Sequence, residues 1–132
     1  MNRTTIWIKA FRLRTLPLAL SATILGSFLG YAQNQFKWGV FIFGTLTTLF
    51  LQVLSNLAND YGDAVKGTDN EQRLGPLRVT QAGLVTRTAM RWMIFIFVTL
   101  SLVSGSLMIW IGLRNGPFLE YSVFFLLGFS AI

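Results

Sequence analysis

The chain contains no cysteine and no histidine, and only 12% of its 132 residues are charged. The two absences exclude disulfides, thiolate nucleophiles, Cys/His zinc sites and histidine general bases from this segment. The scarcity of charge argues against a soluble domain, in which about a quarter of the residues are charged. With 53% hydrophobic residues, among them 12 Phe and 4 Trp, the composition predicts a membrane protein.

Charge is missing altogether from three stretches of 22 residues each. The charged residues that bound them are Arg14 and Lys37, Lys37 and Asp60, and Arg91 and Arg114. At about 1.5 Å per residue, each stretch forms a helix of roughly 33 Å, which can cross a hydrocarbon core of about 30 Å. The three stretches therefore predict three transmembrane helices.

A fourth uncharged stretch follows Glu120 and has 12 residues, which form a helix of roughly 18 Å, too short to span the membrane. We therefore predict an all-α membrane protein with three full transmembrane helices and a partial fourth. Because the chain ends within this last element, we expect residues 1–132 to be the incomplete N-terminal part of a single domain.

The net charge of +6 is distributed in a way that argues against nucleic-acid binding. Two basic residues, Lys37 and Arg114, lie on one side of the predicted spans. The other nine lie before the first span or between the second and third: Arg3, Lys9, Arg12, Arg14, Lys66, Arg73, Arg78, Arg87 and Arg91. This positive-inside pattern predicts a cytoplasmic N-terminus and a cytoplasmic loop over residues 60–91.

Two further features bear on how the helices pack. Residues 1–14 mix apolar and basic positions, which predicts an amphipathic segment lying along the membrane interface. Gly26 and Gly30, four residues apart in the first span, predict a flat face for close helix contact.

Polar side chains gather where the second span ends: Gln52, Asn56, Asn59, Asp60 and Asp63. If the helix continues through Asp63, a rotation of about 100° per residue places all five within an arc of about 100°. Interhelical hydrogen bonding explains Gln52 and Asn56 as well as a functional site does. For the other three we favour a site, because carboxylates near hydrocarbon are costly and usually serve an ion or a substrate.

Amide and carboxylate oxygens are hard ligands that suit Mg²⁺ or Mn²⁺. Mg²⁺ commonly binds one or two carboxylates together with waters and substrate phosphates. Basic side chains such as Lys66 and Arg73 can contact the remaining phosphate oxygens. At a membrane surface, this set favours a substrate with a diphosphate head beside Asp63 and an apolar tail between the helices.

Three sequence motifs resemble those of a known family. They are NLANDYGDAVKGTD at 56–69, RLGPLR at 73–78 and RLRTLP at 12–17. Through these motifs, and through their positions relative to the spans, the chain resembles the UbiA superfamily of intramembrane prenyltransferases. Within it, the chain is most similar to the branch that prenylates 1,4-dihydroxy-2-naphthoate in menaquinone biosynthesis.

The resemblance implies a bundle of nine transmembrane helices around a central cavity, in the bacterial inner (cytoplasmic) membrane. It implies Mg²⁺-dependent transfer of a polyprenyl group from polyprenyl diphosphate to the aromatic ring, with loss of the ring carboxylate as CO₂. By the family's pattern, Asn59 and Asp63 form the catalytic pair that holds the metal, and Asp60 and Asp69 are further metal ligands. The implied diphosphate-binding residues are Lys66, Arg73, Arg78 and Arg12.

The chain departs from the superfamily's pattern in two respects. Gly67 stands where many members carry another aspartate, four residues after Asp63, although the naphthoate branch shares this arrangement. The family's second aspartate-rich motif does not occur in this chain. We therefore expect the chain to hold half of the metal site and to be inactive alone. Two alternatives stay open: a UbiA-type enzyme for another aromatic acceptor, such as 4-hydroxybenzoate, and a non-enzymatic membrane subunit.

Overall fold

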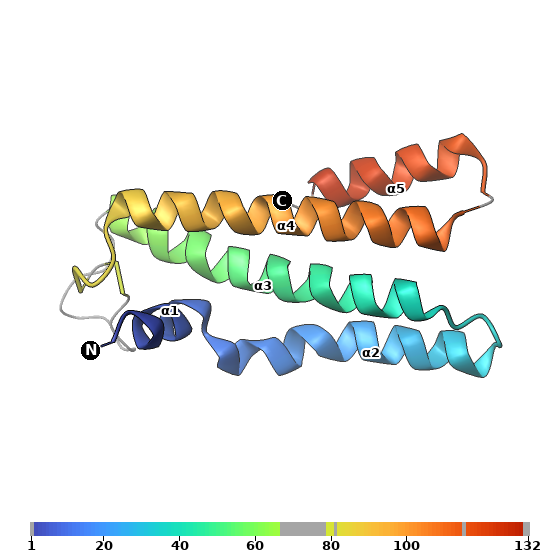
Figure 1. The fold of residues 1–132 in the computed structure, drawn as a ribbon, viewed down its shortest axis with the longest axis horizontal. Coiled ribbons are helices and arrows are strands. Elements are labelled where there is room, and N and C mark those ends of the chain that lie inside the picture. The colour runs from blue at the N-terminus through green and yellow to red at the C-terminus, as the bar shows by residue number, and fades with distance from the viewer. Residues whose placement is uncertain (1, 67–78, 81, 115, 131–132) are drawn as a thin grey trace.

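A computed structural model of the chain describes residues 2–66, 79–80, 82–114 and 116–130. Within these ranges every regular element is a helix. The elements are α1 (Arg3–Phe11), the short 3₁₀ helix η1 (Leu13–Thr15), α2 (Leu16–Ala32), α3 (Trp38–Lys66), α4 (Arg87–Gly112) and α5 (Phe118–Ser130). Figure 1 shows α2, α3 and α4 as long helices running side by side, with the shorter α5 beside one half of α4.

Three helical segments are long and apolar enough to cross a membrane: Arg3–Ala32, Trp38–Lys66 and Arg87–Gly112. The shorter α5, with 13 residues, is apolar but below spanning length. Many large apolar side chains of the spans are exposed, such as Leu18 at 80% and Phe28 at 68%, as suits helices that face lipid. The predicted all-α membrane fold, with three spans and a partial fourth, is confirmed.

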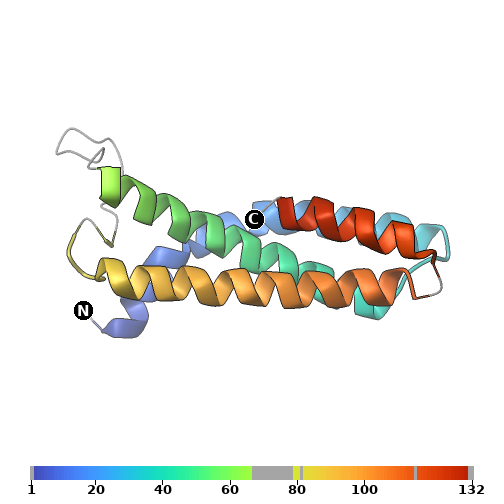
Figure 2. The same cartoon turned by 90° about the horizontal axis from the view of Figure 1, so that it is seen from above.

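Helix α3 lies between α2 and α4 and contacts both (Figures 1 and 2). Hydroxyl pairs join the helices within the apolar region. Thr23 Oγ1 lies 2.8 Å from Thr48 Oγ1 across the α2–α3 contact, and Thr47 Oγ1 donates to Ser104 Oγ (2.9 Å) across the α3–α4 contact. In a bilayer, where water offers no competing partner, such pairs help to fix which faces of the helices meet.

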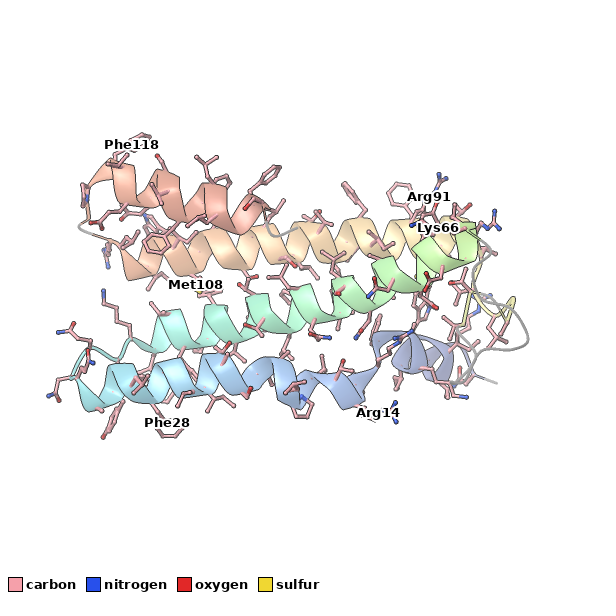
Figure 3. The ribbon with its side chains drawn as sticks, turned by 180° about the vertical axis from the view of Figure 1, so that it is seen from behind. Arg14, Phe28, Lys66, Arg91, Met108 and Phe118 are labelled. Carbon is pink, nitrogen blue, oxygen red and sulfur yellow. The ribbon has the colours of Figure 1, made fainter. Side chains whose placement is uncertain are left out.

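The basic residues gather at one end of the bundle. Helix α1, the last turns of α3 and the start of α4 lie at this end (Figure 1), and Figure 3 shows Arg14, Lys66 and Arg91 there. Lys37 belongs to the opposite end, where its Nζ donates to the Gly112 carbonyl (2.8 Å) and satisfies a terminal carbonyl of α4. The asymmetry of charge along the sequence is therefore an asymmetry between the two ends of the molecule.

A buried core also lies at the basic end. Its buried residues are Ala10, Val53, Leu57, Val79, Val85 and Met90. Trp7 and Phe11 pack against this core from α1, whereas Ile8 on the same helix is 47% exposed. The segment predicted to lie along the interface is therefore a helix that rests one face on α3 and leaves the other face for the membrane surface.

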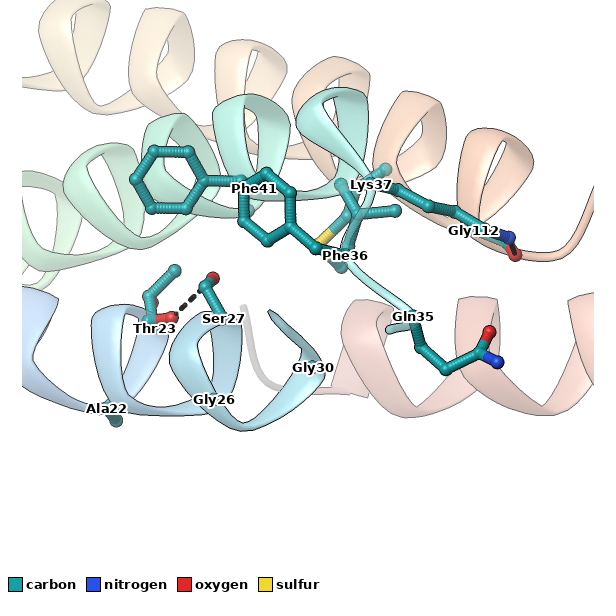
Figure 4. Close-up of a pocket in the computed structure, with 13 residues that line it drawn as sticks. Ala22, Thr23, Gly26, Ser27, Gly30, Gln35, Phe36, Lys37, Phe41 and Gly112 are labelled. Atoms are coloured by element: carbon teal, nitrogen blue, oxygen red, sulfur yellow. Dashed lines mark hydrogen bonds between the residues drawn. The ribbon is translucent and has the colours of Figure 1, made fainter. Parts of the chain in front are cut away.

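No described helix packs closely on the face predicted at Gly26 and Gly30. A Cβ at Gly26 or Gly30 would have nothing within 4 Å among the described residues, so neither glycine permits a close contact there. Both line a pocket of about 440 Å³ that Phe41 also faces (Figure 4). The close approach lies between α3 and α4, where a Cβ at Gly39 would meet Ile111 Cγ2 at 2.9 Å.

Candidate metal and diphosphate site

Helix α3 is unbroken from Trp38 to Lys66, which confirms the assumption behind the predicted polar stripe. Its 29 residues make a helix of roughly 43 Å, about 13 Å longer than the hydrocarbon core. The helix is therefore long enough for its last turns, which carry Asn59, Asp60 and Asp63, to extend beyond the hydrocarbon at the basic end. This is the placement that a site for a charged head group requires.

The two inner members of the stripe bind the N-terminal segment. Asn56 Nδ2 donates to the Phe11 carbonyl (2.9 Å) and to Thr15 Oγ1 (3.1 Å). Gln52 Nε2 donates to the same Thr15 hydroxyl (3.2 Å). Of the two readings left open for Gln52 and Asn56, the structure supports interhelical hydrogen bonding.

The three outer members differ in their access to solvent. Asn59 is exposed and Asp63 is partly buried, and the two lie one turn apart on the same face of α3. Asp60 is only 2% exposed, and its Oδ2 accepts a long hydrogen bond from Thr80 Oγ1 (3.4 Å). Because protein-bound Mg²⁺ usually keeps several waters, Asn59 and Asp63 suit such an ion better than Asp60 does.

Arg12 occupies an unusual backbone conformation between α1 and η1. Its φ of 51° and ψ of 55° lie in the left-handed region, which side chains other than Gly, Asn and Asp seldom adopt. The Thr15 amide and the Thr15 hydroxyl both donate to the Arg12 carbonyl, at 2.9 and 3.0 Å. Arg12 thus lies at the corner that Asn56 binds, although the sequence pattern gave no sign of this turn.

Other predicted residues divide into those that the structure describes and those that it does not. Lys66 is exposed at the end of α3. Asp69, Arg73 and Arg78 lie outside the described residues. Within the described ranges, no group of three or more Asp, Glu, His or Cys side chains is placed to hold a metal. The described part therefore brings Asn59, Asp60 and Asp63 to one helix end without assembling a complete metal site from them.

Two residues with local structural roles escaped the sequence analysis. Arg87, counted there only as a positive charge, donates from Nη2 to the Ala64 carbonyl (3.1 Å) and so ties α4 to the last turns of α3. Thr86 caps α4, since its hydroxyl accepts from the Ala89 amide (3.2 Å). A threonine followed by a helix-forming run is a capping signal, and it could have predicted the start of α4.

Comparison with known protein families identifies the family of this chain. The model of the UbiA prenyltransferase family matches residues 19–131, which is most of the chain. The chain belongs to the UbiA prenyltransferase family. The match includes α3 with its polar end, both neighbouring helices and α5.

Curated relatives of this UbiA family member share one name, 1,4-dihydroxy-2-naphthoate octaprenyltransferase. The chain is 46% identical to the proteins of that name from Haemophilus influenzae, over 83% of this chain and 36% of the relative, and from Escherichia coli, over 80% and 34%. It is 29% identical to the Mycobacterium leprae protein over 75% of this chain. The chain thus spans about a third of the length of the relatives it matches. No solved structure matches it.

Proposed function

We propose that this chain supplies the first part of the active site of an enzyme that transfers a polyprenyl group from polyprenyl diphosphate to 1,4-dihydroxy-2-naphthoate. The observation that carries the proposal is the 46% identity to two relatives of that name, over 112 and 105 residues. The reaction breaks the bond between the allylic carbon and the diphosphate oxygen. It forms a bond from the allylic carbon to the ring carbon that carries the carboxylate, which leaves as CO₂. Such a step belongs to menaquinone biosynthesis.

The donor set at the end of α3 fits Mg²⁺, and Mn²⁺ as a substitute. Asn59 offers an amide oxygen and Asp63 a carboxylate, both hard ligands, at a helix end beyond the hydrocarbon. We assign these two as the residues that hold the metal, with Asp69 as a further candidate, and leave out Asp60 because it is almost fully buried. When bound, Mg²⁺ neutralises part of the negative charge of the diphosphate leaving group.

The rest of the proposed site follows from charge and polarity. Lys66, Arg73, Arg78 and Arg12 would bind phosphate oxygens that the metal leaves free, the arginines in bidentate fashion. The apolar side chains of the spans would hold the polyprenyl tail and keep water away from the allylic carbon. The protein would work as an integral membrane enzyme of the bacterial inner membrane, with this end cytoplasmic.

A chimaera tests the proposal, in which residues 1–132 replace the aligned third of the Escherichia coli relative. We expect it to transfer the polyprenyl group to 1,4-dihydroxy-2-naphthoate in the presence of Mg²⁺, and the 132-residue chain alone to show no turnover. Asp63→Asn should lower transfer by about a hundredfold or more, because the group that holds the metal loses its charge. Glu120→Gln, the same change at an exposed carboxylate of α5, should leave transfer unchanged.

Product analysis with each acceptor separates the alternatives. Transfer to 4-hydroxybenzoate in preference to the naphthoate would assign the chain to another branch of the family. A folded chimaera without transfer to either acceptor would favour a non-enzymatic subunit. Unchanged Mg²⁺-dependent transfer in the Asp63→Asn variant would show that the metal is held elsewhere.

A further inference from the structure

The corner between α1 and α2 holds a strained arginine. A left-handed backbone is unfavourable at a residue such as Arg12, because its Cβ comes too close to the following carbonyl oxygen. Strain of this kind persists only where the surrounding structure enforces it, and it clusters at functional sites. A turn with a purely connecting role would be made at lower cost by Gly or Asn. The presence of a long cation here therefore calls for an explanation in terms of its side chain.

Hydrogen bonds fix the chain on both sides of Arg12. Before it, the Phe11 carbonyl accepts from Asn56 Nδ2 (2.9 Å), and the Phe11 ring lies edge-on to Phe97 with centroids 5.4 Å apart. After it, the Thr15 hydroxyl donates to the Arg12 carbonyl (3.0 Å) and accepts from Asn56 and Gln52. These three bonds use the one donor and both acceptor positions of that hydroxyl.

Asn56, whose amide holds this corner, belongs to α3, the helix that carries the proposed metal ligands. Asn56 lies three residues before Asn59 and seven before Asp63, so it is one turn and two turns away on the same face. Along the axis these separations are roughly 4.5 and 10.5 Å. The Asn56 amide therefore links the backbone beside Arg12 rigidly to the helix end where the diphosphate would bind.

We propose that Asn56, acting with Thr15, is a positioning residue that holds Arg12 in its left-handed turn so that the guanidinium meets the substrate's diphosphate. The inference rests on the proposed function and deepens it. Arg12 contacts the diphosphate, and Asn56 contributes to substrate affinity only through Arg12. The ligand chemistry is a diphosphate monoester anchored by an apolar tail, which a fixed planar guanidinium can bind through two oxygens at once.

A double-mutant cycle in the chimaera tests this. Asn56→Leu and Arg12→Ala should each raise the KM for polyprenyl diphosphate by roughly tenfold, with the KM for the naphthoate and kcat changed by less than about twofold. In the Arg12→Ala background, Asn56→Leu should cause no further rise, because the group that it positions is already gone. Equal effects of Asn56→Leu in both backgrounds would overturn the proposal.

Matched variants separate positioning from general stability. Thr15→Ser keeps the hydroxyl and should behave like the unchanged protein, whereas Thr15→Val should reproduce the KM effect. Thr99→Val is the control. The exposed Thr99 hydroxyl donates to the Phe95 carbonyl of its own helix (2.9 Å), so its removal should leave KM unchanged. A fall in kcat and in folded protein, without a rise in KM, would show that Asn56 is merely structural.

Hydrogen exchange supplies a second readout that does not require turnover. In Asn56→Leu, the amides from Arg12 to Thr15 should exchange at least several-fold faster, while those in the middle of α4 keep their rates. Unchanged exchange at the corner would overturn the proposal even if KM rose. If the unsubstituted chimaera folds but shows no transfer, the proposed function fails and this inference falls with it. If the chimaera transfers the polyprenyl group but the effects of Asn56→Leu and Arg12→Ala on KM are additive, only this inference is refuted.

Discussion

At the scale of single residues, the end of α3 contains carboxylates of two kinds. Asp63 is partly exposed and stands one turn from the exposed Asn59. Asp60 is almost fully buried and pairs with Thr80, from the segment that precedes α4. A carboxylate without access to water suits a hydrated ion poorly, and it suits the attachment of a neighbouring segment well.

Substitution of Asp60 should therefore affect stability more than metal response. Asp60→Ala leaves the Thr80 hydroxyl without this acceptor and should cost about 1–3 kcal/mol of folding free energy. Asp60→Asn keeps an acceptor oxygen and should cost less. Thermal unfolding of the chain in detergent measures both. In the chimaera, the Mg²⁺ concentration for half-maximal transfer should stay the same in Asp60→Asn, and a shift above about tenfold would make Asp60 a ligand.

The angular position of these residues could be predicted from the sequence, but their burial could not. A rotation of about 100° per residue is a local property of any α-helix. The polar stripe from Gln52 to Asp63 could therefore be predicted on the single assumption that the helix continues through Asp63. Asp60 is buried and contacts Thr80, 20 residues further along the chain, and no helical period contains that contact. The left-handed turn at Arg12 was missed for the same reason, because Asn56 is 45 residues from Phe11.

At the scale of the helices, the distance between α3 and α4 depends on where glycine meets a bulky neighbour. The sequence offered Gly26 and Gly30 at a spacing typical of helix contacts, but spacing does not reveal what faces them. In the structure they face a pocket (Figure 4), and Gly39 instead lies against Ile111. The spans themselves were predictable, because their length is fixed by the thickness of the bilayer and shows directly as missing charge.

Substitution by alanine should have opposite effects on stability at Gly39 and at Gly26. At Gly39 the added methyl would meet Ile111 at 2.9 Å, so Gly39→Ala should destabilise the chain by about 1–3 kcal/mol through overpacking. At Gly26 the methyl meets nothing within 4 Å, and alanine favours a helix over glycine by about 0.8–1 kcal/mol. Gly26→Ala should therefore keep or raise the thermal midpoint in detergent. A lower midpoint for Gly26→Ala than for Gly39→Ala would contradict the packing described here.

At the scale of the whole molecule, the two ends of the helix bundle differ in charge and in the elements that lie there. The basic end holds α1, the last turns of α3, the start of α4 and the buried core, whereas the other end holds the end of α2 and the starts of α3 and α5 (Figure 1). Basic loops resist translocation and are attracted to the anionic cytoplasmic leaflet, so this asymmetry should set the orientation of the protein. In that orientation the proposed site would face the cytoplasm, from which the proposed aromatic acceptor and Mg²⁺ would reach it.

Cysteine labelling in intact cells can establish this orientation, because the chain has no cysteine of its own. Ala82→Cys places a thiol at the basic end and Gln33→Cys places one at the opposite end, and both positions are exposed. A membrane-impermeant maleimide should label Gln33→Cys in intact cells, and Ala82→Cys only after the membrane is opened. The opened sample also serves as the control that both thiols are reactive. If Ala82→Cys is labelled first, the basic end faces outward, and a site that takes its substrates from the cytoplasm cannot lie at the end of α3.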